Sequence, residues 1–221
     1  MNRALSKLRD ELLDLQLELR NSKRCAVALI ITGTPAAGRS ETINELLSWL
    51  DPKYVRVHAF GRPDFGERRR PSMWRYWQSL PMRGRMAFYF AGWYADSIAD
   101  PRRASRPAKA KRALERIQQL ESMLVADGVK IVKVHLHVDR KTQRERLKEL
   151  STNKLTRWRV TEEDRWFAKH FAQAQRTAQR CLRASNHDAA SWHVVDGSDT
   201  KQRVLEVGAK LRDALREAVA T

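Results

Sequence analysis

A glycine-bounded loop carries the residue types that bind phosphate. It reads Gly33-Thr34-Pro35-Ala36-Ala37-Gly38-Arg39-Ser40, one position away from G-x-x-x-x-G-K-[ST], a loop whose backbone N–H groups hold phosphate oxygens. Arg39 stands at the lysine position, where it keeps the charge although a planar guanidinium does not replace a compact ammonium. Ser40 keeps the hydroxyl that reaches Mg²⁺ in this pattern. We therefore predict phosphate contacts from Gly33, Ala36, Ala37, Gly38, Arg39 and Ser40; the alternative is a turn that binds no ligand.

The segments on either side of this loop have the pattern that such a site needs. Residues 25–32 form an unbroken apolar run, which is typical of a central parallel strand covered on both faces. Residues 41–50 repeat apolar side chains at helical spacing, so the loop would lie at a helix N-terminus, where the helix dipole favours anions. Four more strand candidates follow, at about residues 54–60, 86–91, 129–138 and 192–197. Because helical segments alternate with them, we predict an α/β fold of the P-loop nucleotide-kinase kind, with a parallel five-stranded sheet and helices on both faces.

The remaining segments fit one domain over residues 1–221. Leucines at steps of three and four predict an amphipathic helix within residues 1–22, which we expect to pack on the domain's own body, with a partner helix as the alternative. Residues 100–112 are basic and interrupted by prolines, so we expect a loop there. Residues 140–170 are rich in Lys and Arg and lie where kinases of this fold carry a basic helical lid.

The composition indicates a chain that attracts polyanions. It has 43 Lys and Arg against 26 Asp and Glu, a formal net charge of +17, and such a field favours nucleic acid, polyphosphate, nucleotides or anionic membranes. No apolar run approaches the ~20 residues of a membrane span, so we expect no membrane association. The two cysteines, Cys25 and Cys181, have no metal-site spacing and do not suggest a disulfide framework, which favours a reducing cytoplasm.

Several motifs together resemble the second polyphosphate kinase family, whose members move phosphoryl groups between inorganic polyphosphate and nucleotides. The family's loop G-x-D-A-A-G-K-G corresponds to residues 33–40. Its W-R-x-W-x-x-L-P-x-x-G-R is matched by residues 74–85, and its D-R-S-W-Y is aligned with Phe90-Ala91-Gly92-Trp93-Tyr94. Its lid pattern R-W-x-x-T-x-E-D corresponds to residues 157–164, and A-P-W-x-V-V to residues 190–195. The resemblance covers nearly the whole chain.

The departures from these motifs fall on the residues that handle metal and phosphate in the family. The two family aspartates, which hold Mg²⁺ and the transferring phosphoryl group, are aligned with Pro35 and Phe90, and a phosphate-binding arginine is aligned with Ala91. Phosphoryl transfer depends on electrostatic positioning by metal, Lys and Arg. The pattern resembles the first half of the two-domain polyphosphate:AMP phosphotransferases, in which that half has a degenerate site. We assign no catalytic residue and no metal ligand, apart from Ser40 as a candidate for Mg²⁺.

These observations predict a polyphosphate-binding domain of this family with a degenerate active site, working beside an active copy of the fold or in a homo-oligomer. One alternative is an active polyphosphate:AMP phosphotransferase that uses Mg²⁺ in a rearranged site. In either case the resemblance implies contacts to polyphosphate or an adenine nucleotide from Arg62, Lys154, Arg157 and Arg159. A second alternative is a basic nucleic-acid-binding module, but no recognised nucleic-acid motif supports it.

Overall fold

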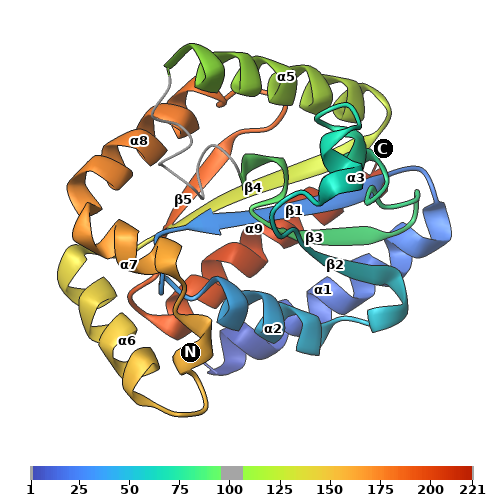
Figure 1. Ribbon diagram of the computed structural model, residues 1–221. Coiled ribbons are helices and arrows are strands. Elements are labelled where there is room, and N and C mark those ends of the chain that lie inside the picture. The colour runs from blue at the N-terminus through green and yellow to red at the C-terminus, as the bar shows by residue number, and fades with distance from the viewer. Residues whose placement is uncertain (1, 96–106, 221) are drawn as a thin grey trace.

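Five parallel strands form the centre of the molecule. The computed structural model describes residues 2–95 and 107–220 (Figure 1). The strands are β1 (Ala26–Gly33), β2 (Val55–Ala59), β3 (Met86–Phe90), β4 (Val129–His137) and β5 (Trp192–Asp196), in the spatial order β2-β3-β1-β4-β5. All four neighbouring pairs are parallel. The predicted α/β fold with a five-stranded parallel sheet is therefore confirmed.

Helices cover both faces of this sheet. On one face lie α1 (Asn2–Ser22), α2 (Arg39–Trp49) and α9 (Thr200–Ala220), and the other face is covered mainly by α5 (Pro107–Ala126) and α8 (Phe171–Ala184) (Figure 1). Strand β1 is buried along almost its whole length and alternates its side chains between the two cores, with Leu29 in one and Ile30 in the other. This double burial explains why residues 25–32 are apolar without alternation.

Helix α1 packs against the domain's own body. Its Leu8, Leu12, Leu15 and Leu19 are buried in the same core as α9 residues such as Leu211. On α1, the Gln16 side chain also exchanges hydrogen bonds with the backbone of Asp51, just after α2, at 3.1 and 2.8 Å. The leucine stripe is therefore occupied within the chain.

The elements between β4 and β5 form a helical segment at the carboxyl ends of the strands. It contains α6 (Arg140–Thr152), a 3-10 turn (Arg157–Arg159) and α7 (Glu162–Lys169), which we call the α6–α7 segment. Two short helices, α3 (Phe65–Arg68) and α4 (Trp74–Trp77), follow β2. Between residues 162 and 184 the chain forms two helices and not one, because the backbone leaves helical geometry at His170. The basic segment 100–112 was expected to be a loop. Its residues from Pro107 on belong instead to α5, and the part before Pro107 lies outside the described residues.

Candidate functional site

The loop between β1 and α2 joins the carboxyl end of the central strand to a helix N-terminus, where the sequence predicts phosphate contacts. Strand β1 ends with the Thr34 N–H donating to the Leu136 carbonyl at 2.9 Å, which fixes the start of the loop on β4. Gly38 then caps α2 with φ at 94°, in the left-handed region that favours glycine. A side chain at this position would also overlap the Arg203 guanidinium. Gly38 is therefore required both by the turn and by the arginine packed behind it.

Two arginines hold the loop and the first turn of α2 against the β5–α9 turn. Arg203 is 1% exposed, and it donates to Thr42 Oγ1 and to the Gly197 carbonyl, both at 2.8 Å. Arg146 donates to the Ala36 carbonyl at 3.1 Å and the Gly197 carbonyl at 2.9 Å. These bonds join the phosphate loop, α6 and the start of α9. Because their guanidinium groups are held by neutral carbonyls and a hydroxyl, both arginines add positive charge next to the loop.

Arg39 is the cation at the head of α2, and its charge is partly balanced by carboxylates. Burial lowers the pKa of the Arg39 guanidinium below its ordinary value, while the charges of Asp164 and Glu41 act in the opposite direction. The pKa of His135 is lowered to about 4, mainly by burial and further by the nearby charges of His137 and Arg39. His135 is therefore neutral near pH 7. The His135 ring contacts Thr32 Oγ1 at 2.9 Å. His135 therefore has a structural partner here.

Two ion pairs connect the α6–α7 segment to the rest of the domain. Arg159 donates to Glu41 at 2.6 Å, and Arg62 donates to Glu163 at 2.8 Å. Burial of the Glu41 carboxyl raises its pKa, but hydrogen bonds from its own backbone and from Arg159 outweigh burial and leave the pKa below its ordinary value. About a third or more of each of the four side chains is exposed, so water and anions reach them. Such pairs stabilise a fold by less than about 1 kcal/mol and are readily exchanged.

A cleft of about 640 Å³ lies between the loop and the α6–α7 segment. Of the predicted phosphate contacts, five line it: Ala36, Gly38, Arg39, Ser40 and Arg159. Gly33 and Ala37 belong to the loop but do not line the cleft. Sequence reasoning missed Arg146 and Arg203, which line it as well.

Three predicted contacts lie elsewhere. Arg62 is engaged by Glu163 on the rim, while Lys154 and Arg157 are exposed on the turn between α6 and α7 and do not line the cleft. The turn projects these two side chains into solvent because its hydrogen bonds, such as Thr156 Oγ1 to the Leu150 carbonyl at 2.9 Å, tie its backbone to the end of α6.

The positions that the resemblance aligns with metal-binding aspartates hold apolar side chains. Pro35 is buried in the loop, and Phe90 packs on the core beside α2 and α9. Three carboxylates line the cleft, those of Glu41, Glu149 and Asp164. Glu41 accepts from Arg159, and Asp164 accepts from the backbone and hydroxyl of Thr161 at 2.8 Å. Within the described parts of the chain, no three His, Cys, Asp or Glu side chains gather into a metal-binding group.

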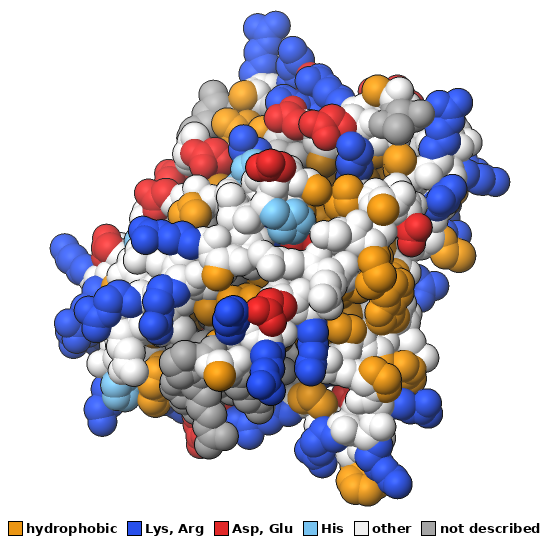
Figure 2. Space-filling view, turned by 90° about the horizontal axis from the view of Figure 1, so that it is seen from above, with side chains coloured by type: hydrophobic (Ala, Val, Ile, Leu, Met, Phe, Trp, Pro, Cys, Tyr) orange, Lys and Arg blue, Asp and Glu red, His pale blue; other side chains and the backbone are white. Residues whose placement is uncertain are grey.

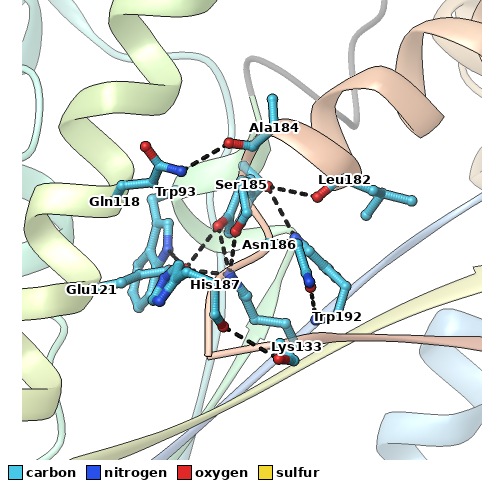
Figure 3. Close-up of polar contacts among 12 residues, drawn as sticks. Trp93, Gln118, Glu121, Lys133, Leu182, Ala184, Ser185, Asn186, His187 and Trp192 are labelled. Atoms are coloured by element: carbon cyan, nitrogen blue, oxygen red, sulfur yellow. Dashed lines mark hydrogen bonds and ion pairs between the residues drawn. The ribbon is translucent and has the colours of Figure 1, made fainter. Parts of the chain in front are cut away.

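A buried polar cluster anchors the turn after β3 (Figure 3). The cluster comprises Trp93, Tyr94, Glu121, Lys133, Ser185 and His187. Glu121 and Lys133 are both fully buried and form an ion pair at 2.7 Å. Trp93 Nε1 and the Tyr94 hydroxyl donate to the other oxygen of Glu121, at 2.9 and 2.8 Å. Burial lowers the pKa of Lys133, and the charge and hydrogen bond of Glu121 act against that lowering. This cluster fixes the Trp-Tyr half of the D-R-S-W-Y-like motif.

The surface is basic well beyond the cleft. Seen from above, Lys and Arg side chains are spread around the molecule and acidic side chains are fewer (Figure 2). Among the helices of residues 2–95 and 107–220, none combines the length and apolar character needed to span a bilayer.

The fold and the loop define a P-loop kinase-like α/β protein, because a glycine-bounded phosphate loop joins a central parallel strand to the following helix. Comparison with known families is specific: the model described as Polyphosphate kinase 2 (PPK2) matches residues 1–220. The chain therefore belongs to the polyphosphate kinase 2 family, as the motifs indicated.

The similar proteins share this family but are longer. The chain is 34% identical over 220 residues to a polyphosphate:AMP phosphotransferase of Pseudomonas aeruginosa and 33% identical over 217 residues to one of Pseudomonas syringae pv. tomato. These matches cover 99% and 98% of this chain but 44% of each relative, so the chain spans about half their length. A crystal structure described as polyphosphate kinase 2 from Pseudomonas aeruginosa PA01 superposes with a TM-score of 0.88 at 31% identity, over 100% of this chain and 45% of that one.

Proposed function

We propose that this chain binds inorganic polyphosphate in the phosphate-loop cleft and does not by itself transfer phosphoryl groups efficiently. The observation that carries this proposal is the charge of the cleft: Arg39, Arg146, Arg159 and Arg203 line it, while the two aspartate positions of the family motifs are Pro35 and Phe90. Arginine guanidinium groups bind phosphate oxygens strongly. Without well-placed acidic groups to hold a metal, the cleft is suited to binding more than to transfer.

The setting that this proposal implies is a polyphosphate-to-nucleotide reaction carried out by an intact copy of the fold. The relatives named polyphosphate:AMP phosphotransferase support AMP as the acceptor, and a relative named AMP/ADP-polyphosphate phosphotransferase adds ADP. This chain matches less than half of the first two relatives, which leaves room in them for a second copy as the partner. That copy would lie in the same longer chain or in an oligomer. The α6–α7 segment would act as the basic lid over the cleft. Cys25 and Cys181 are both buried and share no disulfide, which fits a reducing cytoplasm.

One observation favours the alternative of an active enzyme with a rearranged metal site. Glu41 and Asp164 both line the cleft next to Arg39 and Ser40, so carboxylates are present, although not at the positions of the family motifs. If polyphosphate breaks the bond between Arg159 and Glu41, the Glu41 carboxylate becomes available to a metal ion. Only a turnover measurement separates this alternative from the first proposal.

Binding is tested by titrating the chain with long-chain polyphosphate at fixed salt and comparing Arg39→Ala with Arg56→Ala. Arg56 is exposed on β2, so this control removes the same charge away from the cleft. We expect Arg39→Ala to weaken binding about tenfold or more, since a charged hydrogen bond is worth roughly 1.5–3 kcal/mol. Equal affinities for the two variants would contradict the proposed site. Preference for one base sequence of a nucleic acid over polyphosphate would favour the nucleic-acid alternative.

A further inference from the structure

Helix α6 separates the phosphate-loop cleft from a second hollow on its other side. This second hollow, which we call the outer groove, has a volume of about 870 Å³ and lies between α6 and α7. Leu147 lines both hollows, so only the width of α6 divides them. Arg146 faces the cleft, whereas Arg144 and Lys148 face the outer groove. The two hollows are therefore neighbours on a continuous basic helix.

The outer groove is lined by five exposed cations and one carboxylate. They are Arg140, Lys141, Arg144, Lys148 and Arg165, with Glu145 as the single acid. Among the described residues, no side-chain hydrogen bond or ion pair engages any of the five cations, although Lys141 lies near the Asp139 carboxylate. The cleft differs, because there Arg159 is held by a carboxylate, and Arg146 and Arg203 by backbone carbonyls.

The cations of α6 are arranged in a line. Arg140, Arg144 and Lys148 recur every four residues, so they lie along one side of the helix at intervals of about 6 Å. The helix has 13 residues and is about 20 Å long. Arg165 of α7 faces this row across the groove. A row of unpaired cations along a groove fits a linear polyanion better than a single compact phosphate.

The chemistry of the lining favours a polyanion without bases. Proteins that bind single-stranded nucleic acid combine cations with aromatic side chains on which bases stack. None of the described residues that line the outer groove is aromatic; its apolar members are Leu147, Val160 and Ala168. The groove thus offers charge along a line and no stacking surface. This combination fits a chain of inorganic phosphates.

We propose that the outer groove is a second binding stretch for inorganic polyphosphate, and that a long chain occupies the cleft and the outer groove together by passing around α6. The proposal rests on the proposed function, because the same polyanion is taken to enter the cleft. Two linked stretches on one ligand raise affinity through effective concentration, without any new type of contact. A short chain that fills only the cleft gains nothing from the groove.

The test compares two ligands, long-chain polyphosphate and tripolyphosphate, on four proteins, the unaltered chain and three variants, at several matched salt concentrations. The groove variant is Arg140→Gln, Arg144→Gln and Lys148→Gln combined, and its matched control removes three exposed cations elsewhere, as Arg9→Gln, Lys23→Gln and Arg56→Gln. Arg39→Ala reports on the cleft. Far-UV circular dichroism and thermal melting show whether each variant is folded, and the single Lys148→Gln serves if the triple variant is not.

We expect the groove variant to bind long-chain polyphosphate about tenfold or more weakly than the control, with a shallower dependence of affinity on salt. Its affinity for tripolyphosphate should match that of the control. Equal binding of the long chain by the groove variant and the control would overturn the proposal, and so would an equal loss for both ligands. A groove-dependent affinity for poly(U) RNA that exceeds the affinity for polyphosphate would also overturn it. Failure of Arg39→Ala to weaken tripolyphosphate binding would instead count against the cleft, and so against the proposed function.

Discussion

The phosphate-loop cleft and the buried polar cluster both contain a pair of opposite charges, but the cleft pair is exposed and the cluster pair is buried. In the cleft, Arg159 meets Glu41 at the surface, where water and anions compete for both. In the cluster, Lys133 meets Glu121 with no exposure, and Trp93, Tyr94 and His187 fill the remaining sites of the carboxylate. Water and anions can replace the partners in the exposed pair, but they do not reach the buried pair. The difference fits the proposal that the cleft binds ligands, whereas the cluster holds the shape of the β3 turn.

Breaking the buried pair should have the largest effect. Lys133→Met leaves the Glu121 carboxylate buried without its cation, which costs about 3–5 kcal/mol of unfolding free energy. The matched control is Lys130→Met on the same strand, whose exposed pair with Glu217 at 3.5 Å is worth less than about 1 kcal/mol. Urea unfolding measures both. Similar small losses for the two variants would show that the cluster does not stabilise the fold as described.

Lowering the pH should reduce the free energy of unfolding through His135, near the end of β4. The pKa of His135 is about 4 in the folded protein and about 6.5 when unfolded, so the unfolded chain binds more protons between these values. The contribution of His135 is complete above pH 6.5 and is lost as the pH falls toward 4, with about 2 kcal/mol lost between pH 7 and pH 5. Urea unfolding at both pH values should show a smaller loss for His135→Gln than for the unaltered chain. A loss of the same size in both would contradict the burial of a neutral His135.

Removing the carboxylate of the exposed pair between Arg159 and Glu41 should have the smallest effect. That effect should be on the affinity for polyphosphate. Glu41→Gln removes the carboxylate that competes with phosphate for Arg159, so affinity for polyphosphate should rise about threefold while stability changes by less than about 1 kcal/mol. Glu45→Gln, one turn further along α2 and also exposed, removes the same charge. Titration with polyphosphate compares them. An equal rise in both variants would mean that only net charge changed.

Much of the fold follows from local sequence pattern. The apolar run before Gly33, the glycines of the loop and the alternation of strands with helices predict the parallel sheet, and each of the five strands occurs where expected. The break at His170 leaves no mark in the sequence pattern, because apolar periodicity continues through it, with Phe167 and Phe171 both buried. Helix α5 begins earlier than its apolar stripe, and its early residues Lys111 and Arg112 are exposed.

The candidate site was less predictable because its supports come from distant parts of the chain. Nothing local distinguishes Arg203 from a solvated cation at the start of a helix; only the return of the chain after β5 places it under Gly38. Arg146 is likewise one of several cations on α6, and its role depends on the carbonyls of Ala36 and Gly197. Lys133 did offer a signal, because a lysine in the middle of a buried strand requires a partner.

The central claim is that this chain binds polyphosphate without efficient transfer, and a phosphotransfer assay tests it most directly. The purified chain is incubated with Mg²⁺, long-chain polyphosphate and either AMP or ADP, and the nucleotides are separated by chromatography, while polyphosphate binding is measured on the same preparation. The account predicts binding with no ADP or ATP above a control without protein. Product well above that control, and lost in Arg39→Ala, would contradict the account and show that the cleft has replaced the missing aspartates with other groups.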